Sequence, residues 1–312
     1  MLTGIDIGGT KCAVVLGDES GNVSKKLRFE TTTCKETLEK ILASVHELGV
    51  GQAIGVSCGG PLDEKRGRIL SPPNLPGWDD VPIVDMLEEA FGVPAAICND
   101  ANACALAEWR FGAGRGCEHM VFFTFGTGLG AGIIANGRLY SGAAGMAGEA
   151  GHVRLSPFGP VGYGKSGSFE GFCSGGGLSE LARTYGKEWI QQGKRPAFWG
   201  DGGDFTVKEV ADAARAGDEC ARRVFSVCAE MLGKGLAMVA DILAPERIVL
   251  GSIYERCRDL LEEGALREFR REALPLVYEN CQVLPAALGD RIGDVAALAV
   301  AVEACGRPIG KR

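Results

Sequence analysis

The chain has 312 residues, more than one hydrophobic core usually serves, so its length favours two domains. The net charge is −7, from 33 basic and 40 acidic residues, which argues against nucleic acid as a partner. No basic region precedes an apolar run at the start, and no segment approaches the roughly 18 apolar residues of a membrane span. We therefore expect neither a signal peptide nor a membrane partner.

Strands and helices alternate in the first part of the chain. Short apolar runs bounded by turn residues predict strands over residues 2–7, 11–17, 23–30, 53–57 and 93–98. Apolar residues spaced three and four apart predict helices over residues 34–48, 84–91 and 101–111. This alternation indicates a partly parallel sheet flanked by helices, which is an α/β fold.

The opening pattern then returns. An apolar strand over 120–125, a Gly126-Thr127-Gly128 turn and a strand over 129–135 repeat the strand, glycine turn and strand that begin the chain. This weak duplication predicts two similar halves, with a boundary near the glycine-rich segment 112–116. Residues 136–180 are expected to be loop-rich and residues 187–205 to form a polar surface excursion. Helices are expected over 218–244, 254–274 and 295–304, and a strand over 247–250.

The 12 cysteines lie singly, mostly in apolar segments, and no two form a Cys-x-x-Cys pair. A disulfide framework belongs to shorter secreted chains with clustered cysteines. Free buried thiols in a reducing compartment fit this pattern better, so we expect a cytoplasmic protein.

The first glycine turn carries polar residues that a plain hairpin does not need. Gly8 and Gly9 leave backbone N–H groups free to face an anion, while Thr10 adds a hydroxyl and Lys11 a positive charge. Asp6, at the end of the strand, is suited to hold Mg²⁺ through water. We interpret the turn as a phosphate site, with a structural hairpin as the alternative.

Two later segments add to this interpretation. The turn from Gly126 to Gly132 is followed by a strand rather than a helix, so it is not a dinucleotide fingerprint but resembles a second phosphate-binding hairpin. Asn99-Asp100 follows an apolar strand and opens a helix. Asp100 is either a helix cap or a general base that accepts the proton of an attacking hydroxyl.

A fourth segment, residues 148–152, is glycine-rich and contains Glu149 and His152. A lone histidine is more often structural than catalytic. Beside Glu149, however, His152 offers a donor and acceptors for neighbouring sugar hydroxyls, and Glu170 follows in the same loop-rich region.

Together these motifs resemble those of the ROK family of bacterial sugar kinases and sugar-responsive repressors. Asp6 to Lys11, Asn99-Asp100, the turn from Gly126 to Gly132 and residues 148–152 occur in the family's order. Residues 59–61 and 73–75 match two further family segments. The resemblance extends through about residue 180 and, more weakly, to the last helix.

The resemblance implies an actin-like (ribonuclease-H-like) fold of two domains with a cleft between them. The domains are expected over 1–115 and 116–292, with a C-terminal helix at about 293–305 packing back onto the first. Asp100 would be the base. The sugar would be bound by Asn74, Asn99, Asp100, Glu149, His152 and Glu170. ATP would be bound by Asp6, Gly8, Gly9, Thr10, Lys11, Thr127, Gly128, Gly251 and Ser252.

The chain departs from the family in one loop. ROK proteins carry three cysteines after the histidine that bind structural zinc with it, and the matching positions here hold Val161, Tyr163 and Ser168. A structural zinc site needs about four nitrogen or sulfur ligands, of which only His152 remains. We therefore predict that the protein binds no zinc, which leaves His152 to contact the sugar.

The leading hypothesis is an MgATP-dependent hexose or N-acetylhexosamine 6-kinase, homodimeric as the resemblance implies. Glucose is the first choice of substrate, and N-acetylmannosamine, N-acetylglucosamine, allose and fructose stay open. The alternative is a non-catalytic sugar sensor, against which Asp6, Lys11 and Asp100 count. A different actin-like ATPase is opposed by the Glu149–His152 segment. A repressor is not expected, because no DNA-binding domain precedes Asp6.

Overall fold

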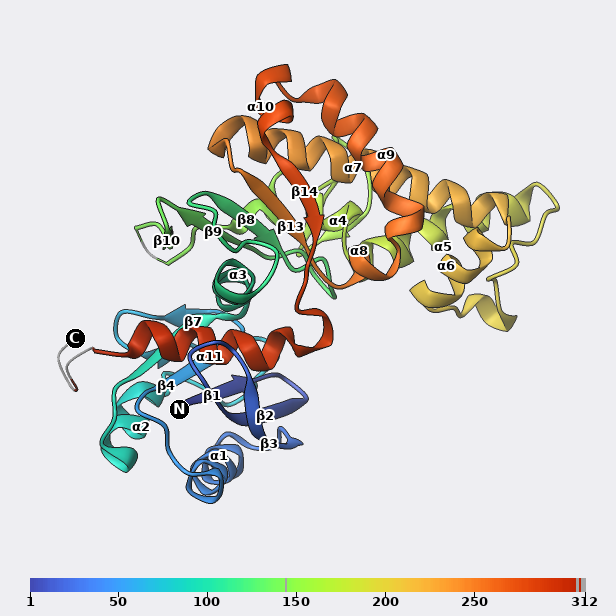
Figure 1. Ribbon diagram of the computed structural model, residues 1–312. Coiled ribbons are helices and arrows are strands. Elements are labelled where there is room, and N and C mark those ends of the chain that lie inside the picture. The colour runs from blue at the N-terminus through green and yellow to red at the C-terminus, as the bar shows by residue number, and fades with distance from the viewer. Residues whose placement is uncertain (144, 307–308, 310–312) are drawn as a thin grey trace. The chain divides into compact units, whose positions relative to one another are not determined.

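The structure is a computed structural model that describes residues 1–143, 145–306 and 309 (Figure 1). The chain divides into two compact units. Unit 1 comprises Met1–Glu118, Gly132–Ala147 and Ala287–Arg312, and unit 2 comprises His119–Ala131 and Gly148–Ala286. Within the described residues, none of the helices combines the length and the apolar character that crossing a membrane requires.

The sheet of unit 1 has five strands in the order β3-β2-β1-β4-β7. β1 runs antiparallel to β2 and parallel to β4, and β4 runs parallel to β7. The strands are β1 (Leu2–Ile7), β2 (Lys11–Gly17), β3 (Val23–Glu30), β4 (Ile54–Cys58) and β7 (Ala95–Asn99). All five predicted strands are confirmed, with their ends shifted by two residues at most.

Helices complete unit 1. The core includes Ile41 and Val45 of the amphipathic helix α1 together with Ile5 of β1. The last helix, α11, packs against β4 so closely that a Cβ on Gly55 would lie 2.2 Å from the Ala297 carbonyl oxygen. Only glycine permits this contact between a helix backbone and a strand backbone. The helices are α1 (Cys34–Leu48), α2 (Ile83–Phe91), α3 (Asp100–Phe111) and α11 (Ile292–Ala304). Two short strands, β5 (Leu62–Asp63) and β6 (Arg68–Ile69), form a hairpin.

A second five-stranded sheet has the order β10-β9-β8-β13-β14. Its strands are β8 (Met120–Phe123), β9 (Ala131–Ala135), β10 (Arg138–Leu139), β13 (Arg247–Leu250) and β14 (Gln282–Pro285). When the strands of each sheet are numbered along the chain, they lie side by side in the same order in both sheets: third, second, first, fourth and fifth. This repeated order confirms the duplication that the two glycine turns predicted.

The helices of unit 2 pack around the long helix α7. A Cβ on Gly233 of α7 would lie 2.4 Å from the Ala265 carbonyl oxygen of α9, so the two helices touch through their backbones. The principal helices are α5 (Gly175–Gln191), α6 (Val207–Arg215), α7 (Glu219–Leu243), α9 (Arg258–Glu272) and α10 (Pro275–Asn280). Short helices are α4 (Phe169–Phe172), α8 (Ile253–Arg256), η1 (Glu149–His152), η2 (Asp201–Gly203) and, in unit 1, η3 (Gly289–Arg291).

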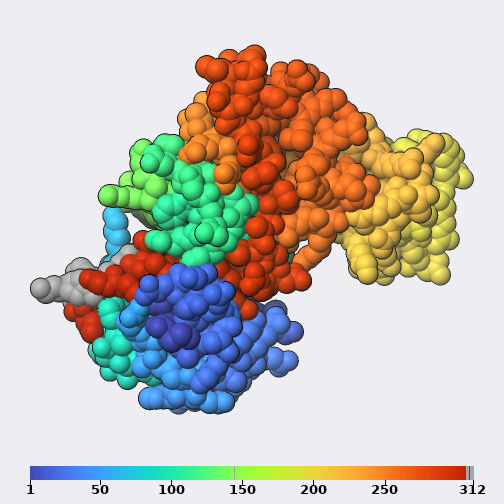
Figure 2. Space-filling view, in the orientation of Figure 1, coloured from blue at the N-terminus to red at the C-terminus, as the bar shows by residue number. Residues whose placement is uncertain are grey.

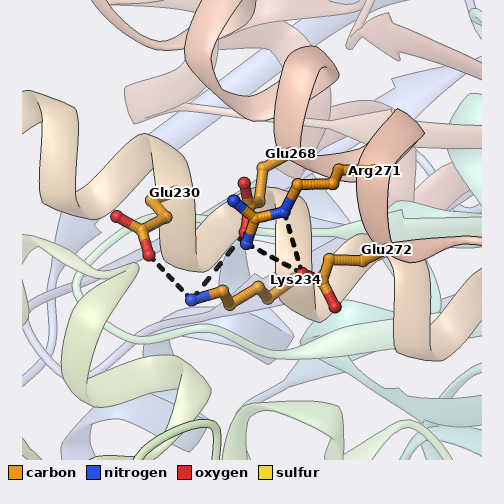
Figure 3. Close-up of polar contacts among 5 residues, drawn as sticks. All are labelled: Glu230, Lys234, Glu268, Arg271 and Glu272. Carbon is orange, nitrogen blue, oxygen red and sulfur yellow. Dashed lines mark hydrogen bonds and ion pairs between the residues drawn. The ribbon is translucent and has the colours of Figure 1, made fainter.

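Charged side chains join α7 and α9 along one edge (Figure 3). Lys234 Nζ lies 2.7 Å from Glu230 Oε1 and 3.8 Å from Glu268 Oε1. Arg271 Nη2 contacts Glu268 and also lies 2.9 Å from Glu272 Oε1. These contacts form a network of mixed sign at the surface of unit 2.

The expected surface excursion over 187–205 is wrong. Its first residues belong to α5, and Phe198 is buried in the core of unit 2. The Trp199 ring covers α5 where a Cβ on Gly186 would lie 2.1 Å from it. This stretch is polar on average, but it contains Phe198 and Trp199. The packing of these two aromatic side chains holds the stretch against unit 2.

Candidate active site

The first glycine turn of unit 1 lies against the segment that carries Asn74. The Gly8 N–H donates to the Lys11 carbonyl oxygen at 3.1 Å, which closes the turn between β1 and β2. A Cβ on Gly9 would lie 2.6 Å from the Asn74 carbonyl oxygen, so glycine is required for the approach. Thr10 and Lys11 are exposed beside it. The structure thus brings a predicted phosphate turn and a predicted sugar ligand together.

Asp6 lies among other carboxylates at the end of β1. Burial, followed by repulsion from Asp294 and Asp100, raises the pKa of Asp6 from 3.8 to about 6, and Lys26 and Arg28 only partly oppose this. Such an excess of negative charge fits a hard cation that keeps most of its water ligands. Among the described residues, no group of three or more His, Cys, Asp or Glu side chains is arranged to hold a metal ion. The holding of Mg²⁺ at Asp6 through water stays a prediction.

The junction of β7 and α3 positions Asp100. Asn99 is the N-cap of α3, because its Oδ1 accepts from the Ala101 N–H at 3.0 Å. Asp100 Oδ1 accepts from the same N–H at 2.8 Å. Asp100 is solvent-exposed, yet desolvation by the surrounding protein raises the pKa of its carboxyl despite these N–H contacts. The start of α3 is therefore capped by Asn99 and contacted by one oxygen of Asp100.

Two glycines mark the point where the predicted sugar ligands of unit 1 converge. A Cβ on Gly59 would lie 3.6 Å from Asn74 Nδ2 and 3.9 Å from Asp100 Oδ2. A Cβ on Gly60 would lie 3.5 Å from Asn99 Nδ2. The missing side chains leave room beside two amides and a carboxylate. The arrangement suits a ligand rich in hydroxyl groups.

In unit 2 the second glycine turn lies beside Gly251 and Ser252, which are predicted to bind the adenosine of ATP. The Gly126 N–H donates to the Gly128 carbonyl oxygen at 2.9 Å, which closes the turn that carries Thr127. A Cβ on Gly126 would lie 3.7 Å from Ser252 Oγ, and the Gly251 N–H donates to the Phe123 carbonyl oxygen at 3.0 Å. Predicted nucleotide residues far apart in the sequence therefore meet in this unit.

Glu170 is tied to the same turn. Its Oε2 accepts from the Leu129 N–H at 2.9 Å, and a Cβ on Gly128 would lie 2.7 Å from that oxygen. Glu170 also lies near η1, where Glu149 and His152 are found, because a Cβ on Gly151 would lie 3.4 Å from the Glu170 Cβ. Glu170 and the short helix η1 therefore both lie beside the glycine turn of unit 2.

Sequence reasoning missed two residues of unit 1. Glu64 accepts from the Asn99 N–H, and Asp294 raises the pKa of Asp6. An acidic residue at the start of the closing helix was visible as a helix-start signal, although nothing linked Asp294 to Asp6. Glu64 stands in a short hairpin with no periodic pattern, so no local signal identified it.

The chain matches the ROK family over residues 2–304. It belongs to this family. It is 34% identical to a glucokinase from Halalkalibacterium halodurans, over 93% of this chain and 91% of that protein. It is 31% identical to an N-acetylmannosamine kinase from Salmonella typhi, over 83% of this chain and 85% of that protein. A ROK family glucokinase from Streptomyces griseus, solved in complex with glucose and AMPPNP, is 34% identical with a TM-score of 0.78, covering 97% of this chain and 99% of that one.

Membership of the ROK family confirms the actin-like α/β fold predicted from the motifs. The glucokinases among the relatives support a sugar kinase, and the relative solved with AMPPNP supports binding of ATP.

This ROK protein orders the loop after His152 without the family's cysteines. Tyr163, at one cysteine position, stands edge-on to the His152 ring, with 5.2 Å between ring centroids. Lys165 Nζ donates to the His152 carbonyl oxygen at 2.7 Å. Ser168, at another cysteine position, caps α4 by accepting from the Gly171 N–H at 3.0 Å. The absence of bound zinc stays a prediction, and these contacts describe how the loop is held.

Asp6→Asn provides a test of the charge at the site. The folded chain raises the pKa of Asp6 from 3.8 to about 6 and therefore binds more protons than the unfolded chain between those values. The contribution of Asp6 to stability accordingly falls as the pH rises through this window. At neutral pH the variant should melt a few degrees higher than the natural protein. That difference should shrink in acid, where Asp6 is protonated. A variant that melts lower at every pH would contradict the account, as measured by thermal unfolding across pH.

Proposed function

We propose that the protein transfers the γ-phosphoryl group of ATP to the 6-hydroxyl of a hexose, glucose first, with Asp100 as the general base. The observation that carries the proposal is the convergence of Asp100 with Asn74 and Asn99 around Gly59 and Gly60. A carboxylate and two amides beside an open space are suited to bind several hydroxyls of one sugar and to deprotonate another.

The proton transfer follows from the surroundings of Asp100. The carboxylate accepts the proton of the attacking hydroxyl, and the hydroxyl oxygen then attacks the γ-phosphorus. Desolvation raises the pKa of Asp100, which makes it a stronger base than an ordinary aspartate. The N–H of Ala101 holds one carboxylate oxygen and leaves the other for the sugar.

The nucleotide is assigned to the two glycine turns. In unit 1 it is assigned to Asp6, Gly8, Gly9, Thr10 and Lys11, which offer a carboxylate, a close backbone approach, a hydroxyl and an ammonium. The Gly8 N–H itself closes the turn by donating to the Lys11 carbonyl oxygen. In unit 2, Thr127 and Gly128 face the phosphates, and Gly251 and Ser252 bind the adenosine. When bound, Mg²⁺ offsets charge on the phosphates, and Asp6 would hold it through water.

Glu149, His152 and Glu170 are assigned to the remaining sugar hydroxyls. One oxygen of Glu170 is already occupied by the Leu129 N–H, so its second oxygen would be the ligand. N-acetylmannosamine, N-acetylglucosamine, allose and fructose stay open as substrates, because they share most of the hydroxyls that these residues would contact. The alternative function is a cytoplasmic sugar sensor that binds through the same residues without transfer.

Asp100→Asn tests the assignment of the base. The turnover number should fall by about 10²- to 10⁴-fold, since the variant loses the proton acceptor, while the dissociation constant for glucose changes little. Steady-state kinetics and calorimetry measure the two quantities. Asp85→Asn is the matched control, because it removes a carboxylate from the first turn of another helix in unit 1. Near-normal turnover in Asp100→Asn would remove Asp100 from the role of base.

We also propose a homodimer that forms through the ends of α7 and α10. Ile242 and Leu276 are each 73% exposed and Leu274 is 62% exposed. The α10 segment lies at the surface in Figure 2. Exposed apolar groups gathered in one place mark interaction sites, and the neighbouring network of Lys234 and Arg271 with glutamates carries both signs of charge. A surface of mixed sign can pair with its own copy across a twofold axis.

Light scattering tests this interface. The natural protein should have the mass of a dimer, and a variant with both Ile242→Asp and Leu276→Asp should have the mass of a monomer at micromolar concentration. Phe158→Asp is the control, because Phe158 is equally apolar and 82% exposed but lies in another loop of the unit. A monomeric natural protein, or a double variant that stays dimeric, would contradict the proposal.

A further inference from the structure

The sheet of unit 1 ends at β7, which has a strand neighbour on one side only. Two backbone N–H groups of this edge strand donate to side-chain carboxylates. The Ala95 N–H donates to Glu88 Oε1 at 3.1 Å, and the Asn99 N–H donates to Glu64 Oε1 at 2.8 Å. The carboxylates thus act at opposite ends of one strand. Only the Glu64 contact is adjacent to Asp100.

The Asn99 backbone determines where Asp100 lies. At Asn99 the chain changes from strand to helix, and its side chain caps α3. Asp100 is the next residue, so a rotation of the Asn99 backbone would displace both the cap and the carboxylate. The Glu64 contact is a charge-assisted hydrogen bond, which is stronger than a neutral one. It fixes the last N–H of β7 at the point where that rotation would occur.

Glu64 itself is held by a closed hairpin. It lies between β5 and β6, where Asp63 Oδ1 accepts from the Arg66 N–H at 2.9 Å. Glu64 also lines a cavity of about 970 Å³, together with Ile97 and Cys98 of β7. Its side chain is therefore not enclosed in the core, and its replacement should not disturb the packing of unit 1.

We propose that Glu64 is a positioning residue, whose carboxylate holds the Asn99 backbone so that Asp100 meets the substrate hydroxyl. This inference rests on the proposed function, in which Asp100 is the general base. Glu64 does not contact the reacting atoms. It acts through the hydrogen bond to Asn99.

Three variants test the proposal by steady-state kinetics with glucose and MgATP. Glu64→Ala should lower the turnover number about tenfold or more, because displaced catalytic groups lose rate steeply, while the KM for glucose changes less. Glu64→Gln keeps an acceptor oxygen and should restore turnover to within about twofold of the natural protein. Glu88→Ala is the matched control, since it removes the same kind of contact from the other end of β7, and its turnover should stay normal.

The pH dependence of kcat/KM is a second measurement. It would not change if Glu64 only stabilised the fold. Desolvation by the surrounding protein raises the pKa of Asp100, so an Asp100 displaced from those surroundings should ionise at lower pH. The acid limb of kcat/KM should therefore move to lower pH in Glu64→Ala and stay in place in Glu64→Gln. If Glu64→Ala fails to fold, Glu64→Met fills a similar volume without an acceptor and takes its place.

Three results would overturn the inference: normal turnover in Glu64→Ala, an equal loss in Glu88→Ala, or no rescue by Glu64→Gln. Asp100→Asn separates this failure from that of the proposed function. If Asp100→Asn is inactive and Glu64→Ala is normal, the inference about Glu64 fails and the base stands. If Asp100→Asn retains its turnover, the proposed function fails with it.

Discussion

The candidate site of unit 1 depends on the end of strand β7, where a buried strand becomes a helix within one residue. Asn99 caps α3 by accepting from the Ala101 N–H, a contact that Asp100 shares through one oxygen only. The junction of β7 and α3 lies beside Gly59, at the carboxyl end of the strand. Ligands of α/β proteins bind at the carboxyl ends of parallel strands. The backbone of this junction therefore determines where Asn99 and Asp100 lie, and their side chains then determine what the site can bind.

Electrostatics adds a second constraint. Asp6, Asp100 and Asp294 lie close enough that the second and third raise the pKa of the first. A protein selected only for stability would not keep this arrangement, since like charges at short range oppose folding. A site that binds a cation and accepts a proton needs such charges. The loss of folding stability that they cause is typical of functional sites.

Much of the fold could be predicted from the sequence because its strands are short apolar runs between glycine turns. The first three strands were predicted to the residue, and the two glycine turns indicated a duplication that the sheet orders confirm. The helix α10 and the strand β14 were missed, because each is a few residues long and lacks a clear period. The burial of Phe198 was missed because its neighbours are polar.

The site was harder to predict in full. Motif residues such as Asn99 and Asp100 stand together in the sequence, whereas Glu64 meets them only through a hairpin 35 residues away in the chain. The loop after His152 shows the same limit, since the substitution of Tyr163 for a cysteine indicated a lost zinc ligand but not the ring contact with His152. The domain bounds and the individual ligand roles stay predictions.

The most direct test of the central claim is a coupled assay of ADP release with MgATP against glucose, N-acetylmannosamine, N-acetylglucosamine, allose and fructose. The account predicts release with glucose at a kcat/KM about tenfold or more above that of the other sugars. No release with any sugar, in a protein that still binds glucose in a calorimeter, would contradict a kinase and favour the sugar sensor.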